Sequence, residues 1–100
     1  MEKRTPHCKL ALIHQLVRAG QVRTTFTALA GAAALGLDTV AVFEVVLGLA
    51  PSDFCKSMTT HGDHRIWQDV YRTQTAVRRV YLKLTVLDGL LIVSFKELTE

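Results

Sequence analysis

The stretch VYLKLTVLDGLLIVSFKE, residues 80–97, decides the fold of this chain. Apolar and polar residues alternate on either side of an Asp88-Gly89 pair, and this pattern is typical of a β-hairpin. Asp-Gly favours a two-residue turn, which would fix the register of the two strands. One face of the hairpin is then wholly apolar and must pack against the core. The predicted apolar pairs are Leu82–Phe95, Leu84–Val93 and Val86–Leu91.

The reverse face of this hairpin is polar and gathers an aromatic hydroxyl with ammonium groups. If residues 74–75 form the preceding turn, Gln68 lies opposite Tyr81, in a row across three strands that ends at Lys96. The predicted pairs on the polar side of the hairpin are Tyr81–Lys96, Lys83–Ser94 and Thr85–Ile92.

Short alternating runs rich in Val, Tyr, Thr and Ile extend the sheet toward the middle of the chain. In the first of these runs, Lys56 and Met58 share one face and Ser57 takes the other. Lys56 could therefore join the polar row. The predicted strands cover residues 54–60, 66–73, 77–87 and 90–97.

The first half of the chain carries helical signals instead. Gly20 and Gly36 each follow a run that suits a helix, and glycine at these places is typical of a left-handed cap. Gly31 weakens the second of these helices, and Asp38 can cap a third. The predicted helices cover residues 9–19, residues from 24 or 25 to 35, and residues 38–47.

Helices followed by strands predict an α+β fold, with the N-terminal helices packed on one face of a C-terminal antiparallel sheet. A chain of 100 residues with 49% hydrophobic content suits one folding unit, so we expect a single domain over residues 1–100. Asp38 and Glu44 interrupt the apolar middle, so we expect no membrane span. Cys8 and Cys55 stand alone without a secretory segment, which favours the cytoplasm over a disulfide framework.

Histidine and cysteine residues make metal chemistry the first candidate. Cys55, His61 and His64 lie near one another in sequence, but their spacing matches no zinc pattern. Residues 61–64 are better interpreted as a turn with exposed imidazoles. The carboxylates are scattered singly, which argues against a two-metal nuclease. We therefore expect no metal site and no cofactor.

The predicted polar face is the stronger candidate for chemistry. Metal-free cleavage of RNA requires cations for the developing phosphorane charge, together with a proton donor and a proton acceptor. These groups could come from Lys56, Arg72, Tyr81, Lys83 and Lys96. A net charge of +3 mildly favours an anionic partner. The alternative is an ordinary solvated face of a two-layer fold.

Long blocks of the sequence resemble the MqsR toxins. The blocks are MEKRTPH (1–7), LVRAGQVRTT (16–25), LGLD (35–38), SDFCKSMTT (52–60), DHRIWQDVYR (63–72), VYLKLTV (80–86) and LLIVSFKE (90–97). They cover most of the chain. Departures are confined to the Ala-rich helix, residues 40–46, His61 and residues 73–79.

The resemblance implies a RelE-like fold and the toxin of a type II toxin–antitoxin system. Its activity would be ribosome-independent endoribonuclease cleavage of single-stranded mRNA at short sites containing a GC step, which arrests translation and growth. A protein antitoxin is implied as partner, with promoter DNA reached only through that antitoxin. By position, the resemblance assigns catalysis to Lys56, Gln68 and Tyr81, and RNA binding to Met58, Arg72 and Lys96; Lys83 joins the RNA-binding group from the register argument.

Two other classes of function fit the same charge pattern. A non-catalytic RNA- or DNA-binding module would use the basic face only to hold the nucleic acid. A pure interaction protein would use an open sheet edge to capture a partner. A labelled transcript separates the three, because it would be cleaved, retained intact or ignored.

Overall fold

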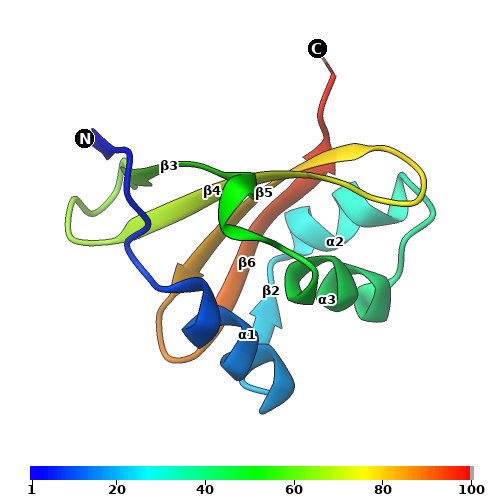
Figure 1. Cartoon of the computed structure of the whole chain (residues 1–100), viewed down its shortest axis with the longest axis horizontal. Helices are drawn as coiled ribbons and strands as arrows, with labels where there is room; N and C mark the ends of the chain where they lie inside the picture. Colours follow the sequence, from blue (N-terminus) through cyan, green and yellow to red (C-terminus); the bar gives the residue numbers. More distant parts are fainter. Residues whose placement is uncertain (100) are drawn as a thin grey trace.

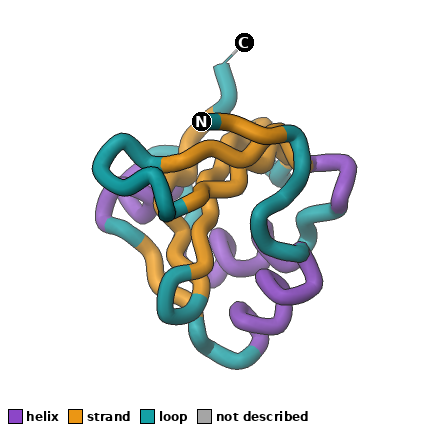
Figure 2. Tube along the Cα trace, turned by 90° about the vertical axis from the view of Figure 1, so that its left-hand side faces the viewer, coloured by secondary structure: helices purple, strands orange, loops and turns teal. Residues whose placement is uncertain are grey.

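The computed structural model describes residues 1–99 as a layer of helices on one face of a six-stranded sheet (Figure 1). Figure 2 shows the strands running through the middle of the molecule, with the helices around them. The elements are β1 (Glu2–Lys3), α1 (Leu10–Arg18), β2 (Val22–Thr24), α2 (Phe26–Ala33), α3 (Thr39–Leu47), the 3-10 turn η1 (Pro51–Asp53), β3 (Phe54–Thr59), β4 (Trp67–Gln74), β5 (Arg79–Val86) and β6 (Leu90–Glu97). The α+β prediction is confirmed.

The helices begin and end where local signals place them. The Thr25 side chain accepts a hydrogen bond from the Ala28 N–H at the start of α2, and Asp38 does the same for Ala41 in α3. Gly20 and Gly36 adopt positive φ angles of 74° and 77° after α1 and α2. These predicted caps are confirmed. None of the helices within residues 1–99 has the length and apolar character needed to cross a membrane.

The sheet has the strand order β1-β3-β4-β5-β6-β2. All neighbouring strands are antiparallel except β2, which runs parallel to β6. The two outermost strands, β1 and β2, were not predicted. Each has only two or three residues, so neither shows the alternation from which strands are recognised in a sequence.

The core lies between the helical layer and the apolar face of the sheet. Leu82, Leu84 and Phe95 from the β5–β6 hairpin are at most 1% exposed, as predicted for that face. Helices contribute the other side of the core through Ile13, Val17, Ala28, Ala32, Val42 and Val46. The reverse face of the sheet is left without a covering layer (Figure 1).

The register of the β5–β6 hairpin agrees with the prediction only far from its turn. Val86 pairs with Leu90, so the loop holds residues 87–89 rather than the Asp88-Gly89 pair alone. Asp88 and Gly89 do adopt positive φ angles, 57° and 95°. The predicted pairs Leu84–Val93, Val86–Leu91 and Thr85–Ile92 are therefore wrong, and the observed pairs are Leu84–Ile92, Val86–Leu90 and Thr85–Leu91.

A β-bulge then restores the predicted register. The pairing shifts between Lys83 and Leu84, where one extra β6 residue, Val93, is accommodated. Beyond the bulge the predicted pairs Lys83–Ser94, Leu82–Phe95 and Tyr81–Lys96 are confirmed. The polar residues of the hairpin consequently stand where the simple turn model placed them, although the turn itself is longer.

Candidate functional site

The uncovered face of the sheet carries seven predicted site residues from four adjacent strands. These residues, called the polar face here, are Lys56 and Met58 of β3, Gln68 and Arg72 of β4, Tyr81 and Lys83 of β5, and Lys96 of β6. Alternation along the strands, interrupted at the register shifts in β3 and β6, turns them away from the helical layer. The sheet thus brings all the residues proposed from the sequence onto one face, although Gln68 does not stand in the cross-strand row predicted for it.

The central row of the polar face is Arg72, Tyr81 and Lys96. Arg72 pairs with Tyr81, and Tyr81 pairs with Lys96. The predicted place of Gln68 in this row is wrong. The β4–β5 loop spans residues 75–78, closed by a 2.9 Å hydrogen bond from the Thr75 N–H to the Arg78 carbonyl, so the register differs from that of a two-residue turn.

The second row across the strands is Lys56, Val70, Lys83 and Ser94. Gln68 lies two residues before Val70 on β4, opposite Met58 of β3. Val70 is fully buried although it lies outside the helix-side core, and the lysines on both sides of it belong to the polar face. Lysine stems commonly cover apolar surface in this way while their ammonium groups reach water.

Tyr81 is enclosed by positive charge. The Nζ atom of Lys96 lies 5.2 Å from the centroid of its ring, and the Nζ atom of Lys83 lies 5.9 Å from it. Both distances are within the range of cation–π attraction. The residue is half-buried, so its ring lies on the sheet face beside these ammonium groups.

Lys56 forms an ion pair that the sequence did not predict. Its Nζ atom lies 2.8 Å from Oε1 of Glu2, on the edge strand β1. The hydrogen bond to Glu2, followed by the charge of that carboxylate, raises the pKa of Lys56, and the same hydrogen bond lowers the pKa of Glu2. In the sequence, the only signal for these first residues was that the block MEKRTPH is among those that carry the family resemblance.

A buried carboxylate ties the segment after β1 to the sheet. Asp69 is 2% exposed on the helix side of β4, and it accepts 3.0 Å hydrogen bonds from the backbone N–H groups of His7 and Cys8. His7 also stacks on Trp67 at a centroid distance of 5.6 Å, and the Lys3 Nζ lies 4.2 Å from the centroid of the Trp67 ring. The N-terminal segment is therefore held by contacts along its length.

The residues first considered for metal binding lie apart from the polar face. His61 and His64 are exposed in the β3–β4 loop, where Thr60 Oγ1 donates to the Asp63 carbonyl at 2.8 Å. This confirms the predicted turn. Cys55 is half-buried at a register shift in β3. Across residues 1–99, no three His, Cys, Asp or Glu side chains form a cluster suited to a metal ion.

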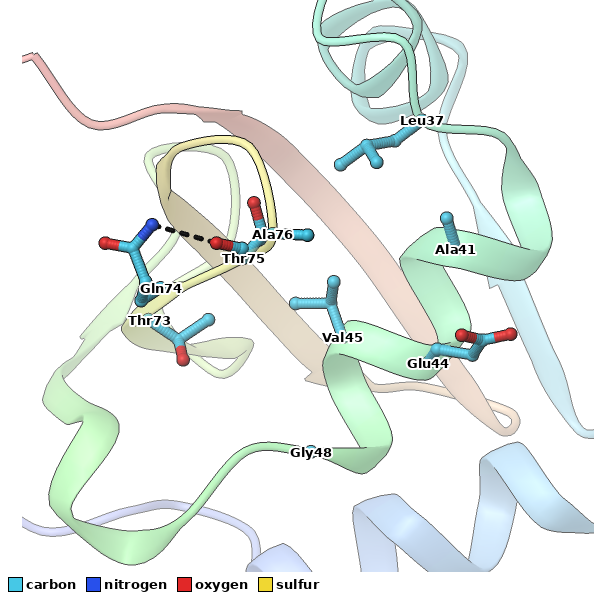
Figure 3. Close-up of a pocket in the computed structure, with 9 residues that line it drawn as sticks. All are labelled: Leu37, Ala41, Glu44, Val45, Gly48, Thr73, Gln74, Thr75 and Ala76. Carbon is cyan, nitrogen blue, oxygen red and sulfur yellow. Dashed lines mark hydrogen bonds between the residues drawn. The ribbon is translucent and has the colours of Figure 1, made fainter.

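The surface is also hollowed away from the polar face. One groove of about 320 Å³ runs between α3 and the β4–β5 loop (Figure 3). Its lining includes Leu37, Val45 and Thr75 but no lysine or arginine. The candidate site is instead an open cationic sheet face, which suits a long flexible anion better than a small enclosed ligand.

Two comparisons with known proteins give matches over nearly the whole chain. Residues 5–97 match the family described as the motility quorum-sensing regulator, toxin of MqsA. The chain is also 59% identical, over 97 residues, to the mRNA interferase toxin MqsR of Escherichia coli (strain K12). That alignment covers 97% of this chain and 99% of the relative.

Proposed function

The chain belongs to the MqsR toxin family, and from this premise we propose that its polar face is the active site of an mRNA interferase. We propose further that it cleaves single-stranded mRNA at short GC-containing sites, without a ribosome and without a metal ion. The observation that carries the proposal is the row Arg72, Tyr81 and Lys96, with Lys56 and Gln68 close by on the neighbouring strands.

The proposed chemistry is an internal transfer at phosphorus. The 2′-hydroxyl of one nucleotide attacks its own 3′-phosphorus, and its proton passes to a side chain of the polar face. The bond to the next nucleotide's 5′-oxygen breaks, and that oxygen takes a proton from a second side chain. The products are a 2′,3′-cyclic phosphate and a free 5′-hydroxyl, so atoms balance without water or a cofactor.

The side chains divide between proton transfer and charge stabilisation. Of Tyr81 and Lys56, one in its deprotonated form accepts the proton of the 2′-hydroxyl, and the other in its protonated form donates a proton to the leaving 5′-oxygen. The Gln68 amide can orient the reacting groups. Arg72, Lys83 and Lys96 supply fixed positive charge where the phosphorane gains negative charge. Met58, opposite Gln68 on β3, offers an apolar contact for a base.

A protein antitoxin and RNA are the partners that the family implies. We propose that the antitoxin extends a sheet edge, because β1 and β2 cover the outer strands over only two or three residues and leave backbone groups available for pairing. Promoter DNA would be reached only through that antitoxin. The site of action would be the cytoplasm, where mRNA is translated.

The first test is cleavage of a labelled single-stranded transcript by the purified protein in a strong chelator. We expect cleavage to continue, because the positive charge comes from Lys and Arg side chains. Activity that returns only with added divalent metal would contradict this mechanism. Retention of intact RNA would instead indicate a binding module, and indifference to RNA an interaction protein.

Two tyrosines on neighbouring strands provide a matched pair of variants. Tyr81→Phe should reduce the cleavage rate about 10²-fold or more, because it removes a proton-transfer group. Tyr71→Phe makes the same change on the buried helix-side face and should leave the rate close to wild type. Equal activity of the two variants would exclude Tyr81 from catalysis. Lys56→Ala and Gln68→Ala are expected to behave as Tyr81→Phe does.

A further inference from the structure

Glu2 lies beside the polar face, and the proposed catalysis gives it no role. It pairs with Met58 across β1 and β3, so it shares the face of the cations. Among strand residues of the described chain, it is the only carboxylate on this face, because Asp69 and Glu97 pair with buried Leu84 and Val80 on the helix side. The single acid of a cationic face is thus bonded to a proposed catalytic lysine.

The position of Glu2 is built by several contacts beside it. The amino group of Met1 donates to Thr59 Oγ1 at 3.2 Å, and the Thr59 N–H donates to the Met1 carbonyl at 3.0 Å. Asp69 holds the chain further on, at His7 and Cys8. Glu2 therefore stands at a fixed place between two anchored points, rather than at the end of a loose tail.

The ion pair draws the lysine toward the sheet edge. β1 flanks β3 on one side, whereas β4 and then β5, which carries Tyr81, flank it on the other. The Lys56 Nζ contacts Glu2 on the outer side. A carboxylate oxygen at 2.8 Å from an ammonium nitrogen has the geometry and charge of a phosphate oxygen in the same place.

We propose that Glu2 is an internal competitor of RNA, whose carboxylate occupies the phosphate position on Lys56 in the free toxin. A phosphate of the incoming strand must displace this carboxylate before Lys56 can turn toward the scissile position. The inference rests on the proposed role of Lys56. Both partners are partly exposed, with 31% of the Lys56 side chain and 52% of the Glu2 side chain accessible, so the exchange requires no unfolding.

Displacement of Glu2 by RNA should change how the RNA affinity depends on salt concentration. A cation that neutralises an RNA phosphate releases the counterions condensed on that phosphate, and each such contact contributes about 0.7 to the slope of log affinity against log salt for a single strand. In the wild type the displaced carboxylate of Glu2 stays beside the phosphate and offsets the charge of Lys56, so this contact adds little to the slope. Without Glu2, the slope should steepen by up to about 0.7.

The experiment compares Glu2→Gln with Glu44→Gln, which removes the same charge from α3 in the helical layer. The probe is a fully 2′-O-methylated, GC-containing oligoribonucleotide, which cannot be cleaved because it lacks the attacking hydroxyl. We expect Glu2→Gln to bind it about threefold more tightly at low salt, as suits loss of an exposed ion pair, with the steeper slope. Glu44→Gln should match the wild type in affinity and in slope. The kcat on cleavable RNA should be unchanged in both variants.

A second background separates displacement from simple repulsion. In Lys56→Ala, adding Glu2→Gln should change neither the affinity nor the slope. Equal tightening in that background would show that Glu2 only repels RNA at a distance and would overturn the proposal. So would identical behaviour of Glu2→Gln and Glu44→Gln, or a fall in kcat at unchanged affinity. Full cleavage activity of Lys56→Ala would refute the proposed active site itself, which is a different outcome.

Discussion

At the scale of single residues, the two tyrosines show how strand alternation assigns opposite environments to one side-chain type. Tyr71 is 1% exposed and belongs to the core, whereas Tyr81 lies half-buried on the polar face between lysines. Burial, followed by the nearby charge of Asp69, raises the pKa of Tyr71 to about 12. The same phenol is therefore a packing group on one strand and a candidate proton-transfer group on the next.

The raised pKa of Tyr71 predicts that the protein loses stability at alkaline pH. An unfolded tyrosine ionises near pH 10, so the unfolded state releases this proton before the folded state does. The contribution of Tyr71 is complete below about pH 10 and is lost as the pH rises toward 12. Urea unfolding between pH 9 and roughly 12 should show the free energy of unfolding of the wild type falling by up to about 2 kcal/mol relative to that of Tyr71→Phe. Parallel pH curves for the two proteins would contradict the buried-phenol assignment.

At the scale of elements, one glycine sets the distance between helix and sheet. A Cβ atom added at Gly31 in α2 would lie 1.9 Å from the Phe95 carbonyl oxygen of β6. The obstacle is backbone, so it cannot rotate away. Gly31, which weakens the helix as a sequence signal, is thus the residue that allows α2 to lie directly on β6.

Gly31→Ala should consequently destabilise the fold, by roughly 1–3 kcal/mol, even though Ala is the better helix former. Gly48→Ala is the matched control, because an added Cβ there meets no atom closer than 3.5 Å and the residue has φ −85°. Its stability should stay within about 0.5 kcal/mol of wild type. Denaturant unfolding of the two variants decides the matter, and equal stability would show that α2 can move off β6 at little cost.

At the scale of the whole molecule, a buried carboxylate joins the beginning of the chain to the centre of the sheet. Asp69 accepts from His7 and Cys8, which precede it by 62 and 61 residues. The edge strand β1 and its Glu2–Lys56 ion pair lie just before this clamp. The position of Glu2 beside Lys56 thus relies on a contact made on the opposite face of the sheet.

Asp69→Ala should release the N-terminal segment. It leaves two backbone N–H groups without their acceptor, each of which costs about 1–3 kcal/mol when buried and less where water reaches it. Hydrogen exchange of a peptide covering residues 1–8 should accelerate, while the β5–β6 hairpin stays protected. Asp63→Ala, which removes the ion-pair partner of the exposed Arg65, should leave that peptide unchanged. Retained protection in Asp69→Ala would mean that strand pairing alone holds the segment.

The sequence by itself determined the two faces of the sheet and the ends of the helices. Both follow from local rules: alternation has a period of two residues, and a capping side chain bonds a backbone group three residues away. The pairs Tyr81–Lys96 and Lys83–Ser94 were therefore predictable, as were the caps at Thr25 and Asp38. The family resemblance then selected Lys56, Gln68 and Tyr81 from the many polar residues of that face.

Only the tertiary structure decided the remaining neighbours. The longer β4–β5 loop shifts the register of those two strands, which places Arg72 rather than Gln68 opposite Tyr81. The three-residue turn and the bulge in β6 change the β5–β6 pairs near the turn. β1 has no pattern of its own and exists because it pairs with β3, so the contact of Glu2 with Lys56 has no local signal. Loop lengths and edge pairing depend on contacts between distant residues, and no period along the chain encodes those contacts.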